Sequence, residues 1–234
     1  MTFVQNHDFV DSLLKSRLTP LASPVREQRF ITAYAGDFLF NHYQKMQNTK
    51  ENIRQKALSK RRALGHDKNM HASTLITRAI INSNYYKKAK TIGCYLSMKD
   101  EVNTALIIKE IEKTNKLLFL PKIQADGTIN FIQINKDSNY STNRYGIKEP
   151  ADDKDQDIEK IDLIIMPLVA FDSIGNRIGM GGGYYDKKFQ YLLQNNNKPS
   201  LIGIAFDCQY YKKIQSDIWD VSLDHVFTES GCIF

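Results

Sequence analysis

The chain has 234 residues, of which 42% are hydrophobic and 25% are charged, and its formal net charge is +6 at pH 7. This composition is typical of a globular protein that buries a substantial core, and the length favours one domain with an appendage. No apolar run approaches the ~20 residues needed to span a bilayer. The first residues also lack the basic and apolar regions of a secretory signal. We therefore expect a cytoplasmic protein without membrane partners.

The cysteines and the charge exclude two further classes. Cys94, Cys208 and Cys232 are odd in number and form no C-x-x-C pair, which argues against a disulfide framework or a zinc site. The basic residues are scattered and no nucleic-acid-binding motif is present, so we expect no nucleic-acid partner. A moderate positive charge suits nucleotide phosphates or a polyanionic small substrate.

Residues 1–47 carry no clean periodicity and are interrupted by Pro20 and Pro24. We expect an N-terminal extension of unknown role and weak order, followed by one domain over residues 48–234. Met46 lies just ahead of the well-patterned region. A translation start at Met46 therefore stays open as an alternative.

From Thr49 onward the chain alternates between helical and strand patterns. Helices are expected over Thr49–Leu64, Ala72–Asn82, Thr104–Lys113 and Tyr184–Leu193. Strands are expected over Thr91–Leu96, Leu117–Leu120, Ile129–Ile134, Ile161–Met166, Leu201–Ala205 and His225–Thr228. Short, continuously apolar strands that alternate with helices predict an α/β fold with a largely parallel sheet.

Two local features qualify this pattern. Pro121 is expected to end the strand before it, because proline cannot donate to a β-ladder. Residues 135–160 form a long polar stretch, which is typical of a functional or mobile loop.

In parallel sheets ligands bind beyond the carboxyl ends of the strands. Three groups fall at such ends: residues 97–101, the glycine-rich loop described next, and Asp207.

The run Asn176–Asp186 reads N-R-I-G-M-G-G-G-Y-Y-D and places four glycines in five positions. A glycine loop before a helix directs several free N–H groups at one point, which favours a phosphate group. Arg177 adds positive charge, and Asp186 is placed to hold a divalent cation beside the phosphates. The loop lacks the Lys-Ser/Thr end of a P-loop and the acidic residue of a dinucleotide fingerprint. A plain flexible turn is the alternative.

This loop, together with M-P-L-V-A-F-D before it, L-S-M-K-D-E-V upstream and an early K-x-x-x-R helix, resembles the 5-formyltetrahydrofolate cyclo-ligase (methenyltetrahydrofolate synthetase) family over about residues 49–230. The resemblance implies a three-layer α/β/α fold with a largely parallel sheet, like that of NagB, RpiA and CoA-transferases. It also implies closure of 5-formyltetrahydrofolate, with or without a polyglutamate tail, to 5,10-methenyltetrahydrofolate. The resemblance further implies that the reaction requires ATP and Mg²⁺ and releases ADP and phosphate, and we expect a monomer.

The resemblance also assigns roles to individual residues. Lys50 and Arg54 match a basic pair that contacts ATP phosphates. The ATP-binding loop corresponds to Arg177, Ile178, Gly179, Met180, Gly181, Gly182, Gly183, Tyr184 and Tyr185. The folate side corresponds to Leu96, Glu101, Tyr145, Met180, Gly181, Gly182, Gly183 and Tyr184. Arg177 and Tyr184 are expected to take part in catalysis. Asp186 matches one magnesium ligand and Asp220 a second, with Asp224 as the alternative.

The residues themselves leave simpler readings for some of these positions. Lys50 and Arg54 also fit a solvated basic helix face, and Glu101 a solvated acid, although a carboxylate can accept hydrogen bonds from a pterin. Some relatives carry Arg and Lys where this chain has Met180 and Gly182. Two other functions remain: a binding protein that lost the chemistry, and an isomerase or transferase of phosphorylated sugars that needs no ATP.

Overall fold

The computed structural model describes residues 49–143, 146–152, 160–190 and 198–234. The chain divides into two compact units: Met1–Asn52 with Gln215–Ile218, and Ile53–Ile214 with Trp219–Phe234. In the described part of the smaller unit, the Lys50 ammonium makes an ion pair with the Asp217 carboxylate. The predicted extension, residues 1–47, lies outside the described residues.

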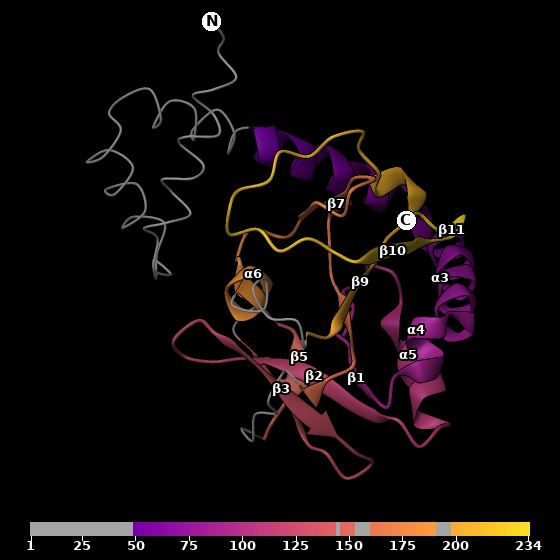
Figure 1. Cartoon of the computed structure of the whole chain (residues 1–234), viewed down its shortest axis with the longest axis vertical. Coiled ribbons are helices and arrows are strands. Elements are labelled where there is room, and N and C mark those ends of the chain that lie inside the picture. The colour runs from indigo at the N-terminus through magenta and orange to yellow at the C-terminus, as the bar shows by residue number, and fades with distance from the viewer. Residues whose placement is uncertain (1–48, 144–145, 153–159, 191–197) are drawn as a thin grey trace, which may run out of the picture. The chain divides into compact units, whose positions relative to one another are not determined.

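A seven-stranded sheet forms the centre of the larger unit, in the order β11-β10-β9-β6-β1-β2-β3 (Figure 1). Its strands are β1 (Thr91–Gly93), β2 (Leu117–Ile123), β3 (Ile129–Ile134), β6 (Leu163–Met166), β9 (Ser200–Ile204), β10 (His225–Thr228) and β11 (Gly231–Cys232). Neighbouring strands from β10 to β2 are parallel. Only the edge strands β3 and β11 run antiparallel to their neighbours. The predicted α/β fold with a largely parallel sheet is confirmed.

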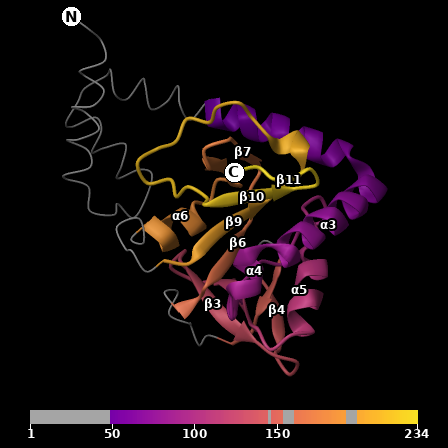
Figure 2. The same cartoon turned by 45° about the vertical axis from the view of Figure 1, so that its right-hand side comes forward.

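Helices cover both faces of this sheet. Figure 1 and Figure 2 show α3 (Gly65–Asn82), α4 (Asn84–Lys88) and α5 (Thr104–Glu112) on one side, and α6 (Tyr184–Phe189) on the other. Within the described ranges, no helix combines the length and apolar character needed to cross a membrane. The layering is the predicted α/β/α arrangement.

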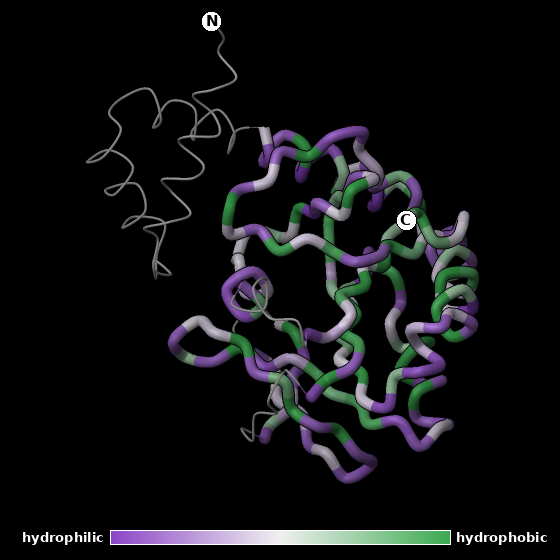
Figure 3. Tube along the Cα trace, in the orientation of Figure 1, coloured by the Kyte–Doolittle hydropathy of each residue, from purple (hydrophilic) through white to green (hydrophobic). Residues whose placement is uncertain are grey.

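The core explains why the strands read as continuous apolar runs. Alternate residues of β6 enter two different clusters, with Leu163 and Ile165 on the α3–α5 side and Ile164 and Met166 on the α6 side. Successive side chains of a strand point to opposite faces, so a strand buried on both faces has no polar positions. Figure 3 shows hydrophobic residues along these central strands.

A third cluster joins the first described helix to a small hairpin. Residues 49–63 are helical, and Ala57 and Leu58 pack with Val169, Ala170 and Ile178. The last two belong to β7 (Ala170–Phe171) and β8 (Arg177–Ile178), which pair antiparallel. This hairpin was not predicted. It separates the glycine loop from β6, which the sequence had suggested as its immediate neighbour.

The prediction that Pro121 ends its strand is wrong, because β2 continues to Ile123 with Pro121 opposite Phe131. The Phe119 carbonyl accepts from the Cys94 N–H on the β1 side. Pro121 lies two residues further and faces the same side, where β1 has already ended at Gly93. The N–H that proline lacks therefore has no ladder partner to lose.

The polar stretch from residue 135 to residue 160 contains structure that periodicity did not indicate. β4 (Tyr140–Thr142) and β5 (Lys148–Pro150) form a two-stranded antiparallel sheet. The buried Glu149 carboxylate accepts from the Ile123 N–H and the Asn143 amide. A carboxylate that fixes a hairpin to the end of β2 explains why short, polar strands are stable there.

Candidate active site

The glycine loop, residues 179–183, connects β8 to α6. Gly181 and Gly183 have φ of 100° and 63°, which side-chain-bearing residues rarely adopt. Among the described residues, no partner accepts a hydrogen bond from the backbone N–H groups of residues 180–183. Met180 is exposed, as are Gly181 and Gly182. The loop thus presents consecutive unbonded amide groups on the surface.

Two arginines flank this loop from different elements. Arg54, from the first helix, donates from Nε to the Gly179 carbonyl at 2.8 Å. A methyl group at Gly181 would lie 3.8 Å from the Arg54 guanidinium carbon. A methyl group at Gly179 would lie 3.9 Å from Nη1 of Arg177. The two predicted phosphate ligands of the larger unit are therefore brought together around the loop.

Asp186, the predicted metal ligand, holds both Arg177 and the chain near Asp220. Its Oδ1 accepts from Arg177 Nη2 at 2.7 Å and from the Val221 N–H at 3.0 Å. Hydrogen bonds from described residues reach only this oxygen, and the side chain is 18% exposed. Because Val221 follows Asp220 directly, the bond places the two predicted ligands in one neighbourhood.

Among the described residues, no group of three or more His, Cys, Asp or Glu side chains is arranged to hold a metal ion. This donor set nevertheless fits magnesium, which commonly takes one or two protein carboxylates and fills its remaining positions with water and substrate phosphates. The alternative ligand Asp224 has both oxygens engaged, by Lys198 and by the Leu201 N–H. The choice of the second ligand, Asp220 or Asp224, stays a prediction.

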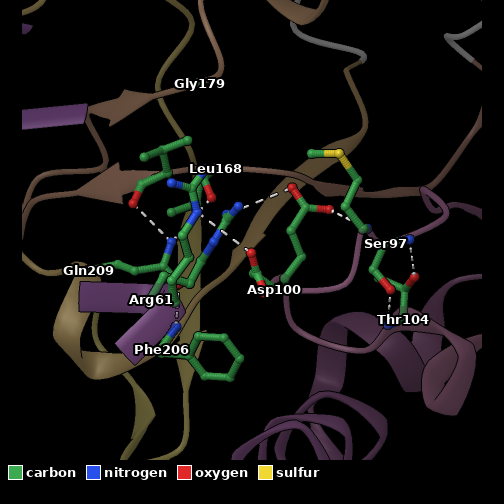
Figure 4. Close-up of polar contacts among 12 residues, drawn as sticks. Arg61, Ser97, Asp100, Thr104, Leu168, Gly179, Phe206 and Gln209 are labelled. Carbon is green, nitrogen blue, oxygen red and sulfur yellow. Dashed lines mark hydrogen bonds and ion pairs between the residues drawn. The ribbon is translucent and has the colours of Figure 1, made fainter. Parts of the chain in front are cut away.

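Glu101, the predicted folate ligand, lies in the loop between β1 and α5. Ser97 and Thr104 close this loop through reciprocal hydrogen bonds between backbone and hydroxyl groups (Figure 4). The Met98 N–H donates to Glu101 Oε2 at 2.9 Å. The Asn69 amide donates to the Glu101 carbonyl and ties the loop to α3. The loop is therefore ordered, and Glu101 is fixed within it.

The Glu101 side chain is only 7% exposed and lies 3.7 Å from the Arg61 guanidinium, itself 5% exposed. Burial raises the pKa of this carboxyl, while the Met98 N–H and the Arg61 charge lower it. The interpretation of Glu101 as a solvated acid is therefore wrong. A buried carboxylate with a charged partner is the kind of group that functional sites contain.

Tyr185 connects the two halves of the site. Burial raises the pKa of its phenol, as does the negative charge of Glu101, whereas the charge of Arg177 lowers it. Its ring stacks on Phe189 of α6, with centroids 6.1 Å apart. The charges of Glu101 and Arg177 therefore both act on this one side chain, which lies in the segment directly after the glycine loop.

The remaining predicted residues lie as follows. Leu96 is half-buried against the core on the α3–α5 side. Tyr184 is half-buried beside the loop, since a methyl group at Gly182 would meet its ring. Tyr145 lies outside the described residues, so its predicted stacking on the folate stays a prediction. The ATP contact expected of Lys50 also stays a prediction.

Sequence reasoning missed three buried polar residues around the site. Gln209 donates to the carbonyls of Leu168 and Val169 and accepts from the Phe206 N–H, which joins the segments after β6 and β9 (Figure 4). Asp172 accepts four hydrogen bonds and shapes the β7–β8 turn. Arg61 pairs with Glu101. The M-P-L-V-A-F-D motif contained Asp172, and Arg61 lies two turns beyond Arg54 in the first helix pattern, but neither was given this role. No local signal marked Gln209.

These features define an α/β protein whose binding groups gather at the carboxyl edge of a parallel sheet. A sequence profile of the 5-formyltetrahydrofolate cyclo-ligase family matches residues 46–229. The chain belongs to this family.

The relatives agree with this assignment. A 5-formyltetrahydrofolate cyclo-ligase of Mus musculus is 31% identical over 193 residues, which cover 79% of this chain and 95% of that protein. The enzyme of Escherichia coli K12 is 35% identical over 146 residues, or 61% and 79% of the two chains. The solution structure of Aquifex aeolicus 5,10-methenyltetrahydrofolate synthetase superposes with a TM-score of 0.68 at 30% identity, covering 78% of this chain and 91% of that one. The Mycoplasma pneumoniae synthetase gives a TM-score of 0.61 at 27% identity, covering 77% and 98%.

Proposed function

We propose that this chain converts 5-formyltetrahydrofolate to 5,10-methenyltetrahydrofolate with ATP, as the names of its relatives describe. The observation that carries the proposal is the glycine loop held between Arg54 and Arg177, with its amide groups exposed. Such a loop suits the phosphates of ATP, because amide N–H groups and guanidinium groups both bind phosphate oxygens. An isomerase of phosphorylated sugars could also bind phosphate at such a loop, but it would not need ATP, so the requirement for ATP distinguishes the two functions.

In the proposed reaction the formyl oxygen attacks the γ-phosphorus of ATP, and ADP leaves. N10 of the folate then attacks the activated formyl carbon and loses its proton to water. The bond between this carbon and the phosphorylated oxygen breaks, and phosphate departs with that oxygen. No protein nucleophile is required. The protein supplies positioning and charge stabilisation, which are the main contributions in phosphoryl transfer.

Arg177 has the central role among the residues of the larger unit. Its guanidinium is almost fully buried against Asp186, and its Nε–H has no hydrogen-bond partner among the described residues. A buried, fixed positive charge stabilises the charge that develops on the transferred phosphoryl group more strongly than a solvated one. Tyr184 stays a second predicted catalytic residue.

Asp186 and Asp220 are the residues that would hold Mg²⁺. A bound magnesium ion neutralises phosphate charge and orients the leaving group. Glu101 would accept hydrogen bonds from the amino-pyrimidine edge of the pterin, beside the half-buried Leu96. We place the reaction in the cytoplasm and expect a monomer that accepts the folate with or without a polyglutamate tail.

The test is a direct assay on purified full-length protein. The protein is mixed with 5-formyltetrahydrofolate, ATP and MgCl₂, and the near-ultraviolet absorbance of methenyltetrahydrofolate is followed. An increase that requires ATP, and that Arg177→Met lowers strongly without changing the melting temperature, would support the proposal. No increase, with ATP bound, would point to a binding protein that lost the chemistry. No increase and no ATP binding would refute the role of the glycine loop.

A further inference from the structure

Two adjacent arginines near the end of the first helix make very different ion pairs. Arg61 faces Glu101 with both side chains buried, at 5% and 7% exposure. Arg62 faces Asp100 with both side chains in solvent, at 66% and 41% exposure. The shortest distance between charged atoms is 3.7 Å in both pairs. Two arginine–carboxylate pairs with the same separation therefore differ in burial, one in the interior and one on the surface.

The buried pair is poorly suited to a purely stabilising role. Removing two charges from water is costly, and replacing a buried ion pair with apolar residues is often neutral or stabilising. The Arg61 Nε–H is also buried, and no described residue accepts a hydrogen bond from it. Such an unsatisfied group lowers stability further. The position of Arg61 is better explained by its effect on Glu101.

We propose that Arg61 is a positioning residue for folate binding, which holds the buried Glu101 carboxylate charged and oriented toward the pterin ring. The proposal rests on the proposed function, since it takes Glu101 as the folate ligand. Glu101 has two oxygens with separate partners: Oε2 accepts from the Met98 N–H, and Oε1 faces Arg61. Together these contacts restrict rotation of the carboxylate.

Apart from Arg61, no charged or titratable side chain described near Glu101 favours the ionised form of its carboxylate. The Asp100 carboxylate raises the pKa of Glu101, as does burial. The phenols of Tyr95 and Tyr185 have pKa values raised by burial, and the pKa of the Cys94 thiol is raised to about 12, so these groups are neutral near pH 7. Arg177 acts on Tyr185 and is paired with Asp186. Arg61 and the Met98 N–H are the groups that favour the charged form of Glu101.

A pH profile separates this role from a structural one. An opposite charge within about 4–6 Å lowers a carboxyl pKa by roughly one to three pH units. In Arg61→Met the pKa of Glu101 should rise by that amount. The KM for the folate should then increase about tenfold for each pH unit below the new pKa. It should return toward the wild-type value as the pH is raised to about 9, because Glu101 then ionises without its partner.

The experiment measures the KM for 5-formyltetrahydrofolate, the KM for ATP and the melting temperature between about pH 6 and pH 9. Arg61→Lys should restore most of the folate affinity. Arg62→Met is the matched control and should behave as wild type at every pH. In a Glu101→Gln background, Arg61→Met should add little further loss and no pH dependence, because there is no carboxylate left to ionise.

A second measurement does not require turnover and includes other variants, so the proposal can still be tested if Arg61→Met is unstable. Protein labelled with ¹³C at glutamate carboxyl groups is titrated by NMR, with the Glu101 signal identified by its loss in Glu101→Gln. The signal should titrate at clearly higher pH in Arg61→Met, at only slightly higher pH in Arg61→Lys, which keeps the positive charge, and at lower pH in Asp100→Asn. An unchanged titration, or a folate KM that rises equally at all pH values, would overturn the proposal. Wild-type protein without ATP-dependent turnover would instead refute the proposed function.

Discussion

The hydrogen bond from Arg54 Nε to the Gly179 carbonyl, 2.8 Å long, allows a sharp test of the nucleotide site. In Arg54→Met this bond and the positive charge beside Gly181 are both lost, while a side chain of similar length remains. A hydrogen bond from the Arg54 guanidinium to an ATP phosphate, which the proposed site would form, is worth about 1.5–3 kcal/mol. Since 1.4 kcal/mol corresponds to a factor of ten, the KM for ATP should rise about 10- to 150-fold.

The folate KM should change much less, because Arg54 contacts the glycine loop and not the segment that carries Glu101. Arg54→Lys should fall between wild type and Arg54→Met, since it keeps the charge but cannot reproduce the Nε–H bond. Lys56→Met is the control. Lys56 is exposed on the same helix, and its substitution removes one positive charge, as Arg54→Met does. The assay is methenyltetrahydrofolate formation at varied ATP, supported by calorimetric binding of a non-hydrolysable ATP analogue.

Three results would refute this reasoning. If Arg54→Met and Lys56→Met raised the KM for ATP by the same small factor, the effect would be a general charge effect and not a contact with the loop. If the folate KM rose while ATP binding was unchanged, Arg54 would belong to the other substrate. If Arg54→Met lowered the melting temperature but left both KM values unchanged, Arg54 would stabilise the loop and would not contact the nucleotide.

Three further predictions concern the metal ligands, the packing of the sheet and the pH dependence. Asp186→Asn should raise the Mg²⁺ concentration for half-maximal rate by more than about tenfold, whereas Asp224→Asn should leave it unchanged; equal effects of both would contradict the assignment. Gly203→Ala places a methyl group 2.6 Å from two leucine methyl carbons, so urea unfolding should show a loss of about 1–3 kcal/mol; an unchanged free energy of unfolding would contradict this packing. Because burial raises the pKa of Glu101, the wild-type folate KM should rise as the pH falls, beginning above the pH at which an exposed glutamate protonates; a flat profile down to pH 5 would exclude it.

The elements that the sequence predicted well are those encoded by local patterns. β3 and β10 begin and end at the predicted residues, and β6 and β9 differ from prediction by one or two residues at their ends. A strand buried on both faces must be apolar at every position, so each run is visible without knowledge of its neighbours. The glycine loop was visible for the same reason, since its requirement for φ > 0 is a property of individual residues.

Contacts between distant segments decided the rest. The length of β2 beyond Pro121 depends on where β1 ends, and the stability of β5 depends on the burial of Glu149 against Ile123. The local sequence of β2 or of β5 contains no pattern that would predict either dependence. The β7–β8 hairpin is likewise shaped by Asp172, which also binds the Ile214 N–H from far along the chain.

The site divides in the same way. The sequence by itself predicted the α/β class, the glycine loop and the charged residues Arg177 and Asp186, because residue type and spacing carry that chemistry. Glu101 was predicted only through the resemblance to the cyclo-ligase family. Only the tertiary structure decided that Arg61 faces Glu101 in the interior while Arg62, the next residue, faces Asp100 in solvent. Burial sets the strength of a charge interaction, and burial depends on the elements that pack around a residue, which no short stretch of sequence contains.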